Sequence, residues 1–122
     1  RRRRVTEKEK IYAMPFAKVY SLLVAKAVRK NRTQFEVDGI ITWLTGYNSC
    51  QIEQAKHNGT TYGAFFQNAP MINPNSVLIK GSICGVKLEQ IEDPLMRNIR
   101  CLDKLVDELA KGKSVEKIKR LE

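Results

Sequence analysis

The side chains that could carry catalysis or bind a metal are few and scattered along the sequence. Among 122 residues there are three cysteines, Cys50, Cys84 and Cys101, and one histidine, His57. A catalytic Cys–His pair needs hydrogen-bond reach, but seven residues separate Cys50 from His57, which is about 10 Å along a helix axis. Cys84 precedes Gly85 in a glycine-flanked segment that leaves its backbone open, so it is the candidate reactive thiol. Cys101 sits in an amphipathic stretch as a small hydrophobic residue, and no catalytic residue is assigned.

Metal and cofactor sites are equally weakly indicated. The sequence has no CxxC or HExxH spacing, and the segment GSICG (residues 81–85) lacks the glycine spacing and the lysine of nucleotide-binding loops. Three carboxylates, Glu89, Glu92 and Asp93, cluster ahead of a predicted helix and could do acid–base chemistry. Acidic residues in this position also stabilise the helix dipole, and this structural interpretation is favoured. We therefore expect no metal and no cofactor.

Positive charge is unevenly placed along the sequence, and the excess outside the first ten residues would not by itself suggest nucleic acid. The sequence carries 22 Lys and Arg against 13 Asp and Glu, a formal net charge of +9. Residues 1–10 hold six cations and two anions, which leaves +5 for the rest of the chain. The run RRRR at residues 1–4 is either a phosphate-binding arm or a flexible tail.

Residues 33–57 have the outline of a helix-turn-helix, with Gly46 as the turn glycine. Ile41, Ile52 and Ala55 fall where the motif needs buried apolar residues. Thr45 also occupies a position that usually points inwards, and a polar residue there counts against the motif. Residues that could contact bases or phosphates face outwards from this outline or come just before it. These candidate nucleic-acid contacts are Arg29, Lys30, Arg32, Gln51, Gln54 and Lys56.

A helix in the middle of this region has the best-defined limits. Thr33 and Glu36 form a capping box, in which hydroxyl and carboxylate satisfy reciprocal backbone N–H groups. Gly46 is placed to adopt the left-handed conformation that ends a helix. Gly39 lies inside the helix at a cost of about 1 kcal/mol relative to alanine, so we expect a neighbouring segment to approach it closely. Trp43 is expected at the edge of the apolar stripe.

Other helices are indicated by apolar spacing and by capping residues. They are expected at 16–30, at 50–57, after Thr60 or Thr61, at 94–111 and, as a final turn, after Ser114. For residues 77–91 we expect helical turns with irregular backbone around the glycines, and a small hairpin is the alternative. The sequence thus predicts an all-α fold, a compact bundle of five or six short helices at mixed angles. Its predicted core comprises Val37, Ile40, Ile41, Leu44, Ile99, Leu102, Val106 and Leu109.

Three segments together resemble the uncharacterised bacterial family known as domain of unknown function 2200. They are KIYAMPFAKVY (residues 10–20), NRTQFEVDGIITWLTGY (31–47) and ICGVKLEQIEDPLMRNIRCLDKLVDELAKGK (83–113). The resemblance extends from about Lys10 to Ile118 and leaves out RRRR. It implies a small cytoplasmic bacterial protein with an all-helical fold, and it carries over no activity and no catalytic residue.

The functional interpretation follows from this lack of chemistry. We expect residues 1–10 to form a basic, flexible tail and 11–122 a single helical domain. The leading hypothesis is a non-enzymatic binding or interaction protein of the bacterial cytoplasm, with a protein partner or a second copy of itself. Nucleic-acid binding through the arm and residues 33–57 is the alternative, and an enzyme is favoured only if Cys84 or the carboxylates line a pocket.

The long helix at 94–111 could dimerise through its heptad-like seam. No apolar run approaches the length of a membrane span.

Overall fold

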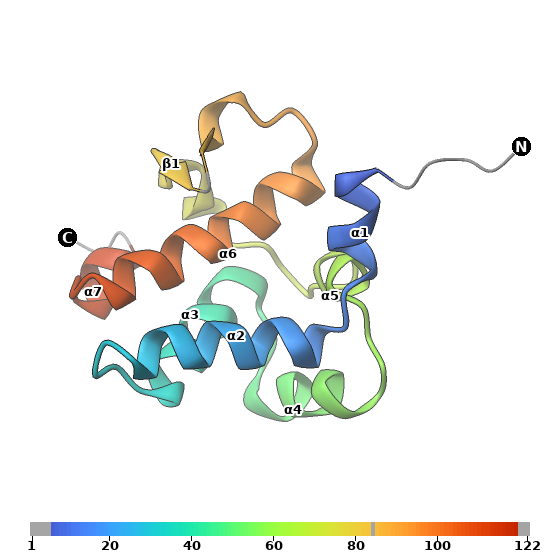
Figure 1. Cartoon of the computed structure of the whole chain (residues 1–122), viewed down its shortest axis with the longest axis horizontal. Helices are drawn as coiled ribbons and strands as arrows, with labels where there is room; N and C mark the ends of the chain where they lie inside the picture. The colour runs from blue at the N-terminus through green and yellow to red at the C-terminus, as the bar shows by residue number, and fades with distance from the viewer. Residues whose placement is uncertain (1–5, 84, 120–122) are drawn as a thin grey trace, which may run out of the picture.

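The computed structural model describes residues 6–83 and 85–119, and these form a mostly helical fold with one two-stranded sheet (Figure 1). The α-helices are α1 (Glu7–Ala13), α2 (Phe16–Val28), α3 (Gln34–Thr45), α4 (Ser49–His57), α5 (Tyr62–Gln67), α6 (Pro94–Ala110) and α7 (Val115–Ile118). Between α5 and α6 lie the 3-10 helix η1 (Pro74–Leu78), the strands β1 (Ser82–Ile83) and β2 (Val86–Lys87), and the 3-10 helix η2 (Leu88–Gln90). The predicted all-α class is confirmed.

The helix limits follow the capping residues closely. Thr33 and Glu36 form the predicted capping box of α3, and Gly46 ends this helix at φ +81°, in the left-handed region. Asn48 caps α4, and Asp93 caps α6 with Pro94 in its first turn. These termini are set by local hydrogen bonding, which is why the sequence shows them.

The core lies where α6 crosses α2 and α3, with α5 packed against the other end of α6 (Figure 1). Every predicted core residue from Val37 to Leu109 is at most 1% exposed. The ring of Phe16 stacks on that of Phe65 with centroids 4.0 Å apart, which joins α2 to α5. The apolar seam of α6, which we considered as a possible dimer interface, is buried within one chain.

Helix α1 overlaps the segment 1–10, which we expected to form a flexible tail. It begins at Glu7 with a capping box between Thr6 and Glu9, so residues 7–10 are helical. The helix packs on α5 at Gly63, where a Cβ would lie 2.9 Å from the Cβ of Tyr12. The close approach of two backbones therefore occurs at Gly63. At Gly39, where we expected it, no described segment approaches: apart from its two chain neighbours and the helix's own local backbone, no atom of residues 6–83 and 85–119 lies within 4 Å of a Cβ position.

Residues 74–91 combine both structures that the sequence left open. The two 3-10 helices flank a hairpin in which Ser82 pairs with Lys87 and Ile83 with Val86. Arg97 on α6 holds this region by donating to the carbonyl of Ile79 at 3.1 Å. Cys84 lies outside the described residues. In the described part of the chain, no helix is both long enough and apolar enough to cross a membrane.

Candidate functional site

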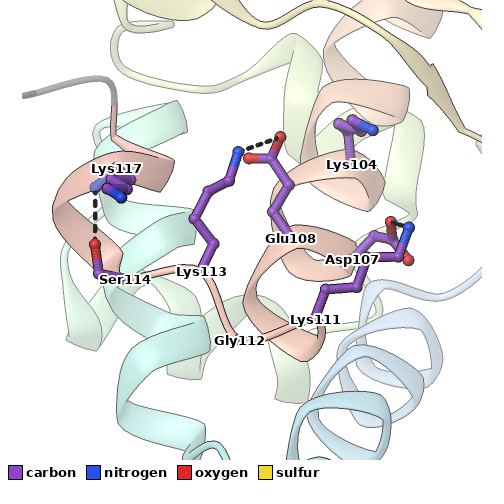
Figure 2. Close-up of a pocket in the computed structure, with 8 residues that line it drawn as sticks. All are labelled: Lys104, Asp107, Glu108, Lys111, Gly112, Lys113, Ser114 and Lys117. Carbon is purple, nitrogen blue, oxygen red and sulfur yellow. Dashed lines mark hydrogen bonds and ion pairs between the residues drawn. The ribbon is translucent and has the colours of Figure 1, made fainter.

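A basin lined by lysines lies over the C-terminal half of α6 and the connection to α7. It has a volume of about 620 Å³, and Figure 2 shows its lining side chains. The lining residues are Lys104, Asp107, Glu108, Lys111, Gly112, Lys113, Ser114 and Lys117. Four of these eight side chains are cationic, so the basin is a place where a negatively charged group would be attracted.

The backbone turn at the end of α6 places these lysines. Gly112 adopts φ +98°, and Lys113 N donates to Glu108 O at 3.1 Å while Gly112 N donates to Leu109 O at 3.1 Å. This pair of bonds is a Schellman motif, which reverses the chain and satisfies the last carbonyls of the helix. Ser114 then caps α7, so that Lys113 and Lys117 face the side chains of α6 across the basin.

Two carboxylates partly neutralise the basin. Glu108 Oε2 lies 3.3 Å from Lys113 Nζ, and Asp107 Oδ2 lies 3.0 Å from Lys111 Nζ. The other oxygen of Asp107 lies 3.1 Å from Lys26 Nζ on α2. Partial burial alone would raise the pKa of Asp107, but the ammonium groups of Lys111 and Lys26 outweigh it and lower that pKa. Asp107 is therefore an anion that links the two helices beneath the cations.

A second hollow of about 620 Å³ continues the basin on its α2 side. It is lined by Lys26, Arg29, Lys30, Asp107, Ala110 and Lys111, so it shares Asp107 and Lys111 with the first. The two hollows form one continuous region, which we call the basic surface. Its cations are Lys26, Arg29, Lys30, Lys104, Lys111, Lys113 and Lys117. Arg29 and Lys30 are exposed, and no ion pair joins either of them to another described residue.

Arg32, one of the predicted nucleic-acid contacts, is occupied by bonds within the fold. Its Nη2 lies 2.6 Å from Glu36 Oε2, and its Nη1 donates to the carbonyls of Leu109 and Lys113 at 3.4 and 3.1 Å. The hydrogen bond from Arg32 is the main cause that lowers the pKa of Glu36 to about 2. Arg32 therefore positions the end of α6, and with it the basic surface, from the start of α3.

The predicted contacts on α4 lie apart from the basic surface. Gln51 accepts a hydrogen bond from Asn48 N at 2.9 Å and completes the cap of α4. Lys56 Nζ lies 2.8 Å from Glu53 Oε2 and 4.4 Å from the centre of the Tyr20 ring. Gln54 is exposed on the same helix, and neither hollow of the basic surface includes a residue of α4. The structure therefore brings Arg29 and Lys30 together and leaves Gln51, Gln54 and Lys56 elsewhere.

Two of the three carboxylates considered for acid–base chemistry, Asp93 and Glu89, have structural partners. Asp93 caps α6 through Leu95 N, accepts a hydrogen bond from Tyr12 Oη at 2.9 Å and pairs with Lys8. Its pKa falls to about 2, chiefly because of the hydrogen bond from Lys8. Glu89 accepts from Gly81 N at 2.6 Å, which ties η2 to the hairpin.

Thiol and metal chemistry gain no support from the described residues. Cys50 is exposed, and Cys101 is buried with Arg97 Nη1 3.3 Å from its sulfur. The single histidine, His57, lies 3.1 Å from Glu53 Oε1. In the described ranges, no group of three or more His, Cys, Asp or Glu residues is placed to hold a metal ion.

The basic surface is not visible as a unit in the sequence. Its cations come from α2, α6 and α7, and the signal was present only as lysines scattered over residues 26–117. A local signal existed for the turn alone, since Lys111-Gly112-Lys113 marks the end of a helix. The clustering arises because the packing of α2 on α6 places the C-terminal ends of both helices side by side, which no local pattern records (Figure 1).

Comparison with known proteins identifies a family and a similar structure, both described as uncharacterized. Residues 10–120 match the family DUF2200, described as "Uncharacterized protein conserved in bacteria". The chain is also similar to the crystal structure of uncharacterized protein SP1917, with 45% sequence identity and a TM-score of 0.88 over 93% of each chain. A search of curated proteins gives no match.

Proposed function

For this chain, which belongs to the bacterial family DUF2200, we propose a non-enzymatic binding function in which the basic surface holds a phosphate-bearing polyanion. Nucleic acid is the class of polyanion that the surface fits best. The observation that carries the proposal is the gathering of seven cations, from α2, α6, α7 and the segments that follow α2 and α6, around two adjoining hollows. Asp107 and Glu108 line the same hollows, so the formal charge of the surface is +5.

The ion pair at Lys111 leaves this lysine available to a ligand. The Lys111 side chain is 73% exposed, and an exposed pair contributes only about 0–1 kcal/mol. Asp107 keeps Lys26 as a partner when Lys111 turns towards a phosphate. Exchange of a carboxylate for a phosphate at Lys111 therefore costs little, while the phosphate gains further neighbours in Arg29 and Lys30.

The chemistry of these cations supports contact with a backbone. Six of the seven are lysines, which act as mobile point charges and lack the rigid fork with which arginine recognises a guanine edge. Such charges neutralise phosphates without reading the bases, and they release counterions on binding. We therefore propose binding that depends steeply on salt and little on nucleotide sequence.

Stabilisation of helix ends is the competing explanation for part of this charge. Cations near the last carbonyls of a helix interact favourably with its dipole, and Lys111 and Lys26 lie in such positions. Lys104 lies more than one turn before the end of α6, and Lys30 lies beyond the end of α2. The dipole effect does not account for these two. Lys104 also donates to the carbonyl of Ser82 at 3.2 Å, so Lys30 is the cation that most favours a polyanion surface.

The proposal is tested by anisotropy of labelled random-sequence duplex DNA and single-stranded RNA, titrated at several salt concentrations. The test variant is Lys30→Ser/Lys111→Ser in the full chain. The control is Lys10→Ser/Lys18→Ser, which removes the same charge from exposed positions of α1 and α2 outside the basic surface. Loss of two phosphate contacts should reduce the slope of log K against log salt by about 1.8 for duplex DNA.

The outcomes separate the possible sources of binding. The proposal predicts about tenfold or greater weakening at roughly 0.1 M salt for the test variant and a much smaller change for the control. Equal weakening by both variants would show that net charge alone drives binding and would overturn the proposal. A third full-length variant, with Arg1 to Arg4 replaced by serine, measures the contribution of the arm. Binding that disappears in this variant while Lys30→Ser/Lys111→Ser binds normally would also contradict the basic surface.

A further inference from the structure

The outward face of α3 presents two aromatic side chains with a glycine between them. Phe35 is 85% exposed, and Trp43 is partly buried at the edge of the core. Gly39 lies four residues from each, so the three positions share one face with about 6 Å along the axis between neighbours. They line a hollow of about 350 Å³ together with Asp38, Thr42, Ser49 and Lys119.

The described residues give no packing reason for a glycine at position 39. A glycine in the middle of a helix weakens it relative to alanine, and such a cost is commonly offset by a close neighbour. Among the described residues, no atom apart from the two chain neighbours of Gly39 and the helix's own local backbone lies within 4 Å of a Cβ placed there, and the residue has no positive φ. The open space above Gly39 is therefore available to a group from another molecule.

Phe35 lies four residues before Gly39 and Trp43 four residues after it, so the two aromatic residues are equally spaced from the glycine. In a two-fold symmetric interface the same patch meets itself, so that residue i contacts j and j contacts i. Two α3 helices that cross in antiparallel sense near Gly39 would bring Phe35 of each copy opposite Trp43 of the other. We propose that this face binds a second copy of the chain, with Phe35 of one copy seated in the hollow between Gly39 and Trp43 of the other.

Charge also favours this face for self-association. Two chains of net charge +9 repel each other, so their contact needs a face without an excess of cations. The hollow on α3 is lined by one anion, Asp38, and one cation, Lys119, whereas the basic surface has a formal charge of +5. The two faces are therefore suited to different partners, and self-association does not depend on the proposed polyanion function.

The size of the face sets the strength of the expected dimer. Four aromatic side chains, two from each copy, would bury at most roughly 600–1,000 Å². Stable interfaces bury about 1,200–2,000 Å². The dimer therefore belongs with weak, transient associations and should be half formed at a chain concentration on the order of 100 μM.

The test combines sedimentation with the fluorescence of Trp43, the only tryptophan of the chain. The full chain is examined from about 5 μM to 1 mM at roughly 0.15 M salt, which screens part of the repulsion. The proposal predicts that the average mass rises from one chain towards two and that the Trp43 emission shifts to shorter wavelength over the same concentrations. A mass that stays that of one chain up to 1 mM would overturn it.

Three variants test the location of the interface. Gly39→Gln fills the open space with a good helix former, and Phe35→Ser removes an exposed ring, so both should remain folded. Each should raise the concentration for half dimerisation at least tenfold. Leu22→Ser, at a 56% exposed position of α2, is the matched control and should leave it unchanged. A dimer that survives Gly39→Gln and Phe35→Ser in folded protein would show that another face is used.

Discussion

Arg32 forms an ion pair with Glu36, one helical turn further along the chain at the start of α3, with Arg32 Nη2 2.6 Å from Glu36 Oε2. The same guanidinium donates to the carbonyls of Leu109 and Lys113. The pair thus connects the N-terminus of α3 to the C-terminus of α6. Glu36 also completes the capping box of α3, with Thr33 N donating to it at 2.9 Å. One carboxylate therefore supports both the helix start and the side chain that holds the end of α6.

The pH dependence of stability should reveal this pair. The pKa of Glu36 is lowered from 4.5 to about 2, so its contribution is complete above about pH 4.5 and is lost as the pH falls towards 2. Glu36→Gln should reduce the free energy of unfolding by about 1–2 kcal/mol at pH 7, because the amide cannot form the ion pair. Urea unfolding from pH 7 to pH 2 measures the difference, which should shrink below pH 4.5. A difference independent of pH would contradict the role of the charge.

Substitution of Gly63 by alanine should destabilise the packing of α1. The added Cβ would lie 2.9 Å from Tyr12 Cβ and 3.2 Å from Tyr12 O, so backbone must move. Overpacking of this kind costs about 1–3 kcal/mol. Thermal unfolding gives the total effect, and hydrogen exchange should show the largest loss of protection in α1 and α5. Unchanged exchange in α1 would show that the two helices are not in close contact.

Substitution of Gly39 by alanine should have the opposite effect on the free energy of unfolding. Gly39→Ala meets no neighbouring atom outside the local helix backbone and improves helix propensity, so it should raise the free energy of unfolding by about 1 kcal/mol. Urea unfolding at low protein concentration checks this in the monomer. A loss of stability there would mean that a part of the chain does approach Gly39.

Replacement of Tyr62 by phenylalanine should stabilise the protein. The Tyr62 hydroxyl is buried and has no hydrogen-bond partner among the described residues, and burial is the main cause that raises its pKa well above the ordinary value. A buried polar group without a partner costs about 1–3 kcal/mol. Tyr62→Phe should therefore raise the melting temperature by several degrees. A lower melting temperature would show that the hydroxyl is hydrogen bonded.

Local hydrogen bonding explains how much of the fold was predictable. The cap of α3 at Thr33 and its stop at Gly46 depend on residues within a few positions, and both were predicted. The capping box of Thr6 and Glu9 gave the same kind of signal for α1, but it lay among charged residues without an obvious apolar face. Residues 77–91 were ambiguous because their short strands and 3-10 turns depend on bonds to α6, such as the one from Arg97 to Ile79.

The candidate site was less predictable because it depends on tertiary packing. Arg29 and Lys30 were selected from sequence and do belong to the basic surface, but their neighbours there, such as Lys111, are about 80 positions away. Arg32 was selected for its charge, which the fold uses internally. The i,i+4 spacing of Arg32 and Glu36 is compatible with their ion pair. The bonds from Arg32 to the carbonyls of Leu109 and Lys113 depend on the packing of α3 against α6, which the sequence does not show.

The central claim is that the surface formed by α2, α6 and α7 binds a polyanion, and amide chemical-shift mapping tests its location most directly. Isotope-labelled full-length protein is titrated with a short single-stranded oligonucleotide at roughly 0.1 M salt. The account predicts that the shifts concentrate at residues 26–30, 104 and 111–117, and that residues 51–56 of α4 change little. Shifts centred on α4, or no saturable shifts at all, would contradict it.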